Sequence, residues 1–339
     1  MEIEKEKEKE TKKQPENLQK IIEEGLSGEI SLIGYPFDIG CERDKIQKGQ
    51  DHGPDCMRRF LGKTGSLKNQ EYDINIENLK ISDYGNIWIP GKEQQILEEV
   101  AEKLQIKISR VFSKKNIPFI IGGSKDTQYS ALKSILNDFP QPYCLTLSSE
   151  YQLQKQSQNN QNKITSKTFV QKFLSESEEK IKNKQFQIEY LGIQQHNINQ
   201  EDIQKLETFK NFIKTVNLNE IRRFPTNQNQ IQNLHFPISQ AGKFFLEKLS
   251  QLKNKQIHLS VALESIQGCY TPGVTKPSVI GGFNCEEIQE IMFQAGKSEN
   301  IQSVDITDYN PSKEDYRTGM LLVNMLYYFA LGYSIRKNQ

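Results

Sequence analysis

Short apolar runs alternate with longer amphipathic segments from about residue 29 to the end of the chain. Six runs are apolar at nearly every position, which is typical of strands buried on both faces of a parallel sheet. They lie at residues 29–35, 117–123, 143–147, 186–193, 256–263 and 301–306. The segments between and after them have helical periodicity, at residues 94–112, 128–136, 168–180, 200–214, 240–252, 285–295 and about 313–333. This alternation predicts a single α/β domain of three α/β/α layers with a mostly parallel, doubly wound sheet.

The ends and insertions of this domain are polar. Residues 1–24 alternate Lys and Glu around Pro15, and we expect a charged N-terminal arm there that is flexible or helical. The folded domain is then expected at residues 25–339. Gln and Asn cluster at residues 152–163 and 226–234, which predicts two surface insertions.

Composition excludes several classes of protein. Hydrophobic residues make up 35% of the chain, so disorder throughout is excluded. Lys and Arg number 44 against 43 Asp and Glu, which leaves no electrostatic footprint for nucleic acid or an anionic membrane. The most apolar stretch, residues 320–334, is too short to span a bilayer and contains Asn324. Five scattered cysteines without a CxxC pair, and an acidic start without an apolar leader, indicate a cytoplasmic protein.

Chemistry is expected at the carboxyl ends of the predicted strands, where open parallel sheets bind their ligands. The sequence GGSKD follows one run at residues 122–126, and SSEYQ follows another at residues 148–152. Ala262 and Glu264 end a third run, and TPGVTKP comes shortly after it at residues 271–277. These segments are therefore predicted to meet at one edge of the sheet.

Six motifs in this order resemble the ureohydrolase superfamily of arginase, agmatinase and formimidoylglutamase, the last being the most similar, over about residues 29–333. They are the opening 33–59 with GPDCMR, GGSKD at 122–126, LTLSSEYQL at 145–153, YLGIQQHNIN at 190–199, SVALESIQGCYTPGVTKP at 260–277 and VDITDYNP at 304–311. The resemblance implies an arginase-like fold. It also implies a site in which two manganese ions are held by carboxylates and imidazoles and activate a hydroxide.

When the six motifs are aligned with those of the superfamily, other residues stand at the positions where the resemblance implies metal ligands. The degenerate positions are Lys125, Ser148, Glu150, Gln152, Ala262 and Glu264. Lysine is a donor only, and serine, glutamine and alanine supply no anionic ligand. We therefore expect neither the manganese pair nor any other cofactor, and no catalytic residue. We expect the ammonium of Lys125 to replace the metal as the partner of Glu150 and Glu264, with Asp126 nearby.

Two further positions of the resemblance bear on ligand binding. Arg43 stands in the loop that holds a substrate carboxylate in formimidoylglutamase-like members, and a surface salt bridge is the alternative. Asp308 stands where the family has a Glu that faces the amidino group, and a turn residue before Tyr309–Pro311 is the alternative. His258 lies in a strand run and indicates a core or sheet-edge histidine rather than a ligand.

Three functions are compatible with this pattern. The first is a pseudoenzyme that has lost the manganese site and has a structural or regulatory role in a larger assembly. The second is an active hydrolase of C–N bonds in guanidino or formimino compounds, with Glu150 and Glu264 as acid–base groups assisted by Lys125. The third is a sensor that binds a ligand near Asp308 and Arg43. Partners would be other proteins or further copies of this chain, and composition alone suggests the cytoplasm, with the cilium or axoneme as a specific place.

Overall fold

The computed structural model describes residues 17–88, 96–154, 163–225 and 238–338. Within them, nine parallel strands form the main sheet in the order β1-β5-β2-β6-β11-β10-β7-β8-β9. The strands are β1 (Ile22–Glu24), β2 (Ile30–Gly34), β5 (Ile81–Asn86), β6 (Ile117–Ile121), β7 (Pro142–Leu147), β8 (Ile188–Ile193), β9 (Ile213–Asn217), β10 (Gln256–Ala262) and β11 (Ile301–Thr307). A separate antiparallel pair joins β3 (Lys68–Asn69) to β4 (Ile74–Asn75).

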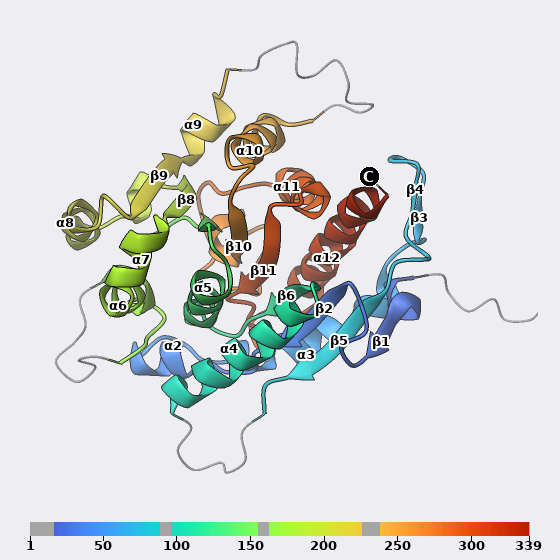
Figure 1. Ribbon diagram of the computed structural model, residues 1–339, viewed down its shortest axis with the longest axis horizontal. Helices are drawn as coiled ribbons and strands as arrows, with labels where there is room; N and C mark the ends of the chain where they lie inside the picture. The colour runs from blue at the N-terminus through green and yellow to red at the C-terminus, as the bar shows by residue number, and fades with distance from the viewer. Residues whose placement is uncertain (1–16, 89–95, 155–162, 226–237, 339) are drawn as a thin grey trace, which may run out of the picture.

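Helices cover both faces of this sheet (Figure 1). One face carries α4 (Leu97–Ser113), α5 (Thr127–Asp138), α6 (Phe169–Glu176) and α7 (Glu178–Lys184). The other carries α10 (Gln240–Gln251), α11 (Cys285–Lys297) and α12 (Tyr316–Lys337). Shorter helices are α2 (Ile39–Arg43), α3 (Gly53–Arg58), α8 (Gln200–Thr208) and α9 (Leu218–Arg222), with 3-10 turns η1 (Leu18–Ile21), η2 (Gln50–His52), η3 (Leu61–Lys63), η5 (Gln195–Asn197) and η7 (Leu263–Ser265).

The predicted three-layer α/β/α fold is therefore confirmed, and all six apolar runs are strands. Successive residues of β6 show why: Phe119 and Ile121 pack in the core under α11 and α12, whereas Ile120 packs in the core under α4 and α5. The alternation of side chains in a strand gives each face half of the run, so a doubly buried strand must be apolar throughout.

Three strands of the main sheet, β1, β5 and β9, were not predicted, and all three lie toward its edges. In β5 only Ile81 and Ser82 are buried, and in β9 only Ile213 is buried, so neither is an apolar run. The predicted helix at 200–214 was wrong beyond α8, which ends at Thr208 and is followed by β9. The predicted helix at 168–180 is two helices, because Ser177 interrupts it.

The N-terminal boundary also differs from the prediction. Residues 1–16 of the expected arm lie outside the described residues, but Leu18 is fully buried and β1 pairs with β5. The folded part therefore begins before residue 25. Of the two expected insertions, residues 226–234 and 155–162 lie outside the described residues. Gln152 and Leu153 are buried, so the segment does not begin as a surface insertion.

Helix α12 completes the core on its side of the sheet. It has 22 residues and, by length and hydropathy alone, could cross a membrane, so the argument from the shorter run 320–334 was wrong. However, 61% of its most apolar window is buried inside the domain, as in the core helix of a folded protein.

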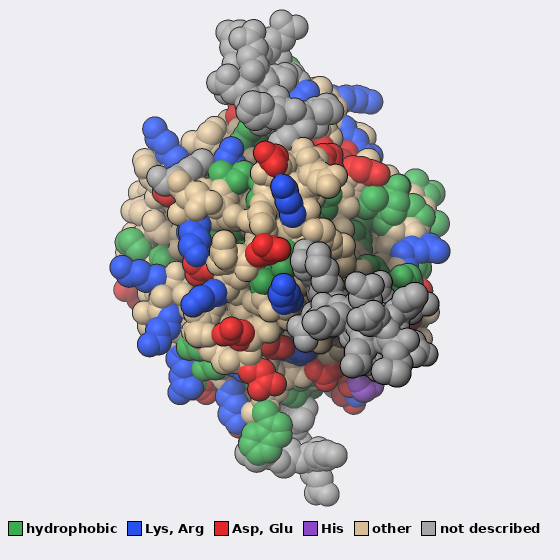
Figure 2. Space-filling view, turned by 90° about the vertical axis from the view of Figure 1, so that its right-hand side faces the viewer, with side chains coloured by type: hydrophobic (Ala, Val, Ile, Leu, Met, Phe, Trp, Pro, Cys, Tyr) green, Lys and Arg blue, Asp and Glu red, His purple; other side chains and the backbone are tan. Residues whose placement is uncertain are grey.

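Basic and acidic side chains are interspersed over the face of the molecule shown in Figure 2.

Two glycines let α11 and α12 approach to backbone contact. A Cβ on Gly332 would lie 2.0 Å from the carbonyl oxygen of Phe293, and one on Gly296 would lie 2.0 Å from that of Phe329. Neither obstacle is a flexible side chain, so any larger residue has to push the two helices apart.

We predict that Gly332→Ala lowers the free energy of unfolding by roughly 1–3 kcal/mol, since the new methyl group overpacks a rigid helix pair. Urea denaturation monitored by circular dichroism measures the loss. Gly65→Ala is the matched control, because a Cβ at Gly65 meets nothing within 4 Å. Equal stability of the two variants would contradict the close helix contact.

Candidate functional site

Four neighbouring strands in the middle of the sheet deliver the candidate site. The order β6-β11-β10-β7 brings their carboxyl ends side by side. Lys125 follows β6, Asp308 follows β11, Glu264 follows β10 and Glu150 follows β7. Residues that are far apart in the sequence thus meet at one edge, as the position of these segments predicted.

The ammonium of Lys125 lies at the centre of this group. Its Nζ is 2.8 Å from Glu150 Oε1, 3.2 Å from Glu264 Oε1 and 3.6 Å from Asp308 Oδ2. The residue is 8% exposed, so water contributes little to its solvation. An ammonium has three N–H donors, and three carboxylates face it here. We call Lys125, Glu150, Glu264 and Asp308 the Lys125 cluster.

Burial and the neighbouring charges shift the pKa values of Lys125 and Glu150 in opposite directions. Burial alone lowers the pKa of Lys125, but the three carboxylates outweigh it and hold the pKa well above its usual value. Burial raises the pKa of Glu150, yet Lys125 and Lys276 together lower that pKa to about 2. Lys125 is therefore an ammonium and Glu150 a carboxylate at neutral pH.

Asp308 differs from the other two acids. Burial, reinforced by Glu264 and Glu150, raises the pKa of Asp308 to about 7 in spite of the nearby Lys125. Its backbone has φ of +75°, and its N–H donates to the carbonyl of Gly123. Such a φ is uncommon for residues other than Gly, Asn and Asp. This geometry holds the carboxyl group over the ammonium, so Asp308 is more than a turn residue.

The remaining degenerate positions support the cluster without joining it. The Ser148 hydroxyl lies 2.6 Å from Glu264 Oε1 and 2.7 Å from the Glu150 carbonyl oxygen. The Gln152 amide donates to the Glu150 carbonyl at 3.1 Å, and its oxygen accepts from the Tyr190 hydroxyl at 3.2 Å. Ala262 is buried at the end of β10 and brings no polar atom.

Asp126 and Arg43 lie elsewhere. Asp126 was expected beside the ammonium, but it accepts hydrogen bonds from Ser124 and from the Tyr35 hydroxyl, so this expectation was wrong. Burial raises the pKa of Asp126 to about 6.

Arg43 donates two hydrogen bonds of 2.9 Å to the carboxylate of Glu98, which is the salt-bridge alternative. Although burial raises it, the pKa of Glu98 is lowered to about 2 by Arg43 and by the N–H of Ile164. The structure therefore brings Asp308 to Lys125 and places Arg43 on a different partner.

Two hollows adjoin the Lys125 cluster, and a salt bridge separates them. The first, of about 220 Å³, is lined by Lys125, Asp308, Gln50, Ser166 and Lys167 among others. The second, of about 230 Å³, is lined by Glu264, His196 and residues 276–280 among others. Both include Glu150 and Lys276, whose Oε2 and Nζ are 2.9 Å apart.

Lys276 and His196 were missed as members of the site. The signals were the motifs that contain them, TPGVTKP for Lys276 and YLGIQQHNIN for His196.

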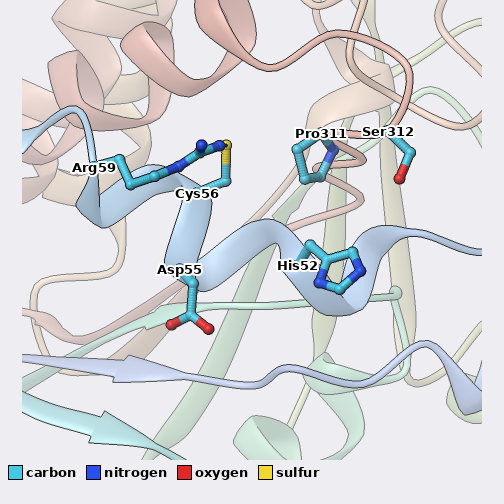
Figure 3. A pocket seen from close by; sticks show the side chains of 6 residues that line it. All are labelled: His52, Asp55, Cys56, Arg59, Pro311 and Ser312. Carbon is cyan, nitrogen blue, oxygen red and sulfur yellow. The ribbon is translucent and has the colours of Figure 1, made fainter.

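A third hollow, of about 450 Å³, contains none of the predicted site residues (Figure 3). His52, Asp55, Cys56, Arg59, Pro311 and Ser312 line it. Figure 3 shows the guanidinium of Arg59 against the thiol of Cys56, with Nη2 2.7 Å from Sγ.

His258 is a core histidine, as predicted. It is fully buried in β10, with its ring nitrogens 2.8 Å from Ser303 Oγ and Asp305 Oδ2. In the part of the chain that the structure describes, no three His, Cys, Asp or Glu side chains are grouped so that they could hold a metal ion.

The protein is thus an α/β/α protein with a parallel sheet and a charged cleft at the carboxyl ends of its central strands. The chain matches the family model of the arginase family over residues 28–332, and it belongs to that family. The resemblance of the six motifs to the ureohydrolase superfamily, and within it to formimidoylglutamase, is confirmed.

Individual relatives agree with this assignment. The chain is 26% identical over 306 residues to an arginase of Plasmodium berghei, covering 87% of this chain and 76% of that protein. It is 20% identical over 300 residues to a formimidoylglutamase of Staphylococcus epidermidis, covering 88% and 85%. A crystal structure of Trypanosoma cruzi formiminoglutamase with Mn²⁺ superposes with a TM-score of 0.76 at 26% identity, covering 91% and 94%.

We predict that Lys125→Met lowers the free energy of unfolding by about 3–5 kcal/mol at neutral pH, because it leaves buried carboxylates without a cation. Chemical denaturation with paired far-ultraviolet circular dichroism measures this loss. Lys276→Met is the control: Lys276 also pairs with Glu150 but is 73% exposed, so its loss should be under about 1 kcal/mol. A neutral Lys125→Met variant would contradict the role of the ammonium.

A second prediction concerns pH. The pKa of Asp308 in the folded protein, about 7, lies above the value of about 3.9 for an unfolded chain. Its contribution to stability is thus present below about pH 4 and lost as pH rises through 7. We expect Asp308→Asn to remove this decline, since Asn tolerates the same backbone angle. Midpoints of urea denaturation, measured between about pH 4 and pH 7, give the size of this decline.

Asp73→Asn is the control, because Asp73 also has a positive φ but is exposed. An undiminished decline in Asp308→Asn would contradict the assignment.

Proposed function

We propose that this arginase-family protein is a pseudoenzyme that holds no manganese pair and acts by binding, with a structural or regulatory role in a larger protein assembly. One observation carries the proposal: the Lys125 ammonium lies within 2.8–3.6 Å of Glu150, Glu264 and Asp308. A cation of the chain itself thus lies among carboxylates, at a position where the resemblance implies a metal ligand.

The donor set does not fit a pair of divalent ions. Glu150 and Glu264 carry two negative charges, and Lys125 neutralises one of them; Asp308, with a pKa of about 7, adds only part of a charge at neutral pH. Two manganese ions would bring four positive charges into this buried group, and desolvating them would be poorly compensated. They would also have to displace an ammonium whose pKa is raised well above its usual value.

The polar neighbours do not repair this deficit. The Ser148 hydroxyl and the Gln152 amide nitrogen already contact the Glu150 backbone, and Ala262 has no donor atom for a metal. Hard divalent ions of this kind prefer carboxylate, imidazole and water ligands. The residues present therefore support a cluster centred on an ammonium of the chain itself rather than a metal centre.

A second candidate is a hydrolase that works without the metal pair. The relatives named above are an arginase, a formimidoylglutamase and a formiminoglutamase, which act on C–N bonds. In this chain, Asp308 with a pKa of about 7 borders a hollow of about 220 Å³ and faces an ammonium at 3.6 Å. A carboxyl group of that pKa is suited to acid–base work near neutral pH.

The first test of the pseudoenzyme proposal is the manganese content of the purified protein. We expect the purified protein, after incubation with excess manganese and desalting, to retain less than about a tenth of an ion per chain by elemental mass spectrometry. The Trypanosoma cruzi formiminoglutamase, crystallised with Mn²⁺, is the positive control. One or two retained ions per chain would overturn the proposal.

Activity is measured on the same sample. We expect no release of ammonia, urea or formamide from arginine, agmatine or formimidoylglutamate above the rate of a Lys125→Met variant. Turnover by the metal-free wild type that is lost in Asp308→Asn would instead establish the hydrolase. Thermal shifts with the same compounds, without turnover, would identify a sensor. We propose that the assembly lies in the cytoplasm, with the cilium or axoneme as its specific place.

A further inference from the structure

A surface groove of about 380 Å³ lies between the end of β5 and the outer face of α4. Tyr84, Trp88, Lys103, Ile106, Lys107 and Arg110 are among its lining residues. It is separate from the Lys125 cluster and shares no lining residue with the hollows beside that cluster.

The helix contributes a coherent face to this groove. Lys103, Ile106, Lys107 and Arg110 are three or four residues apart, so their side chains share one side of α4. Three of the four are cations, and the described residues that line the groove include no Asp or Glu.

These cations are poorly neutralised by the protein itself. Lys103 pairs with Glu99, one turn earlier at 3.3 Å, and exposed pairs of this kind are weak. Lys107 donates to the carbonyls of Gly85 and Asn86, which are neutral acceptors, and lies 4.3 Å from the centre of the Tyr84 ring. Burial, reinforced by Arg58, lowers the pKa of Lys107 to about 8.

Arg110 is exposed. Among the described residues no carboxylate lies within ion-pair distance of its guanidinium or of the Lys107 ammonium. The groove therefore presents positive charge that a ligand could neutralise.

Apolar side chains accompany this charge. Trp88 is 74% exposed and Ile106 is 48% exposed. Tryptophan and arginine are both enriched among the residues that carry most of the binding energy at protein interfaces, and the groove brings one of each together.

We propose that this groove binds an acidic segment of a partner protein that presents an apolar side chain to Trp88. Charge complementarity selects the occupant: three cations, with no acid among the described lining residues, attract Asp and Glu, and Trp88 with Ile106 receives the apolar anchor. The inference rests on the proposed binding role of the chain but uses no residue of the Lys125 cluster.

Single-stranded RNA, the other polyanion that stacks on aromatic rings, fits less well. Its affinity depends on neutralising many phosphates along a continuous basic path. The chain has a net charge of +1, and both signs of charge are interspersed on the face shown in Figure 2. Three cations beside one indole match a short peptide better than a backbone of phosphates.

The chain contains one tryptophan, so selective indole fluorescence reports on this groove alone. The probe is a short synthetic peptide of Glu and Asp that flank one Phe-Leu pair. We expect the emission of Trp88 to shift to the blue and saturate as the peptide is added at low salt, and the affinity to fall as salt is raised. A peptide with Lys in place of the acids should produce no shift.

Variants locate the interaction. The double variant Lys103→Glu, Arg110→Glu should weaken binding on the order of tenfold or more, since it reverses two of the three charges. Lys253→Glu, at an exposed lysine after α10, changes charge in the same sense outside the groove and should bind like the wild type. Trp88→Ala, followed by anisotropy of a labelled peptide, should lose affinity as well.

Three results would overturn the inference: no spectral shift with the acidic peptide, binding that the double variant leaves unchanged, or tighter binding of oligo-uridine than of the peptide. None of them bears on manganese content. Retained manganese together with intact peptide binding would refute the pseudoenzyme alone, so the two proposals fail separately.

Discussion

A buried ammonium has to be neutralised inside the protein, because water is not available to solvate it. In this chain that requirement falls on Lys125, and it is met by carboxylates from the ends of β11, β10 and β7, the three strands that follow β6 on one side in the sheet order. The exits of β6, β11, β10 and β7 are consequently tied together at one point by charge. The sheet order supplies the proximity, and the ion pairs fix how the four loops lie relative to one another.

The cluster and the layers that carry it occupy different parts of the fold. The arginase-family model covers residues 28–332, which include eight of the nine strands of the main sheet, whereas β1 (Ile22–Glu24) lies outside the match. The four charged side chains of the Lys125 cluster belong to neither hydrophobic core, so these positions at the strand exits can change while the layers remain. A lysine with acidic partners is one stable solution at such an edge, because it satisfies the charges that remain there.

Much of the architecture could be predicted because strands buried on both faces are apolar throughout. The polar strand β5, with the sequence ISDYGN, could not, since its pattern reflects its place near the edge of the sheet rather than its conformation. At the site, the pairing of Lys125 with Glu150 and Glu264 followed from aligned motifs. That Asp308 rather than Asp126 lies beside Lys125 did not follow from the motifs, because Ser124 and Tyr35 donate hydrogen bonds to Asp126 and hold its side chain elsewhere. The pairing of Arg43 with Glu98, 55 residues away, likewise depends on tertiary packing.

The contact of α12 with α11 through glycine backbones has a consequence for synthesis. All nine strands of the main sheet precede α12 in the chain, and Phe329 of α12 packs on Phe119 of β6 with ring centres 5.5 Å apart. While a ribosome is still translating residues before 316, α11 is present on this side of the sheet but the part of the cover that α12 supplies is missing. The nascent chain therefore leaves part of an apolar sheet face exposed until its last long helix emerges, which is the interval in which chaperones bind and aggregation competes with folding.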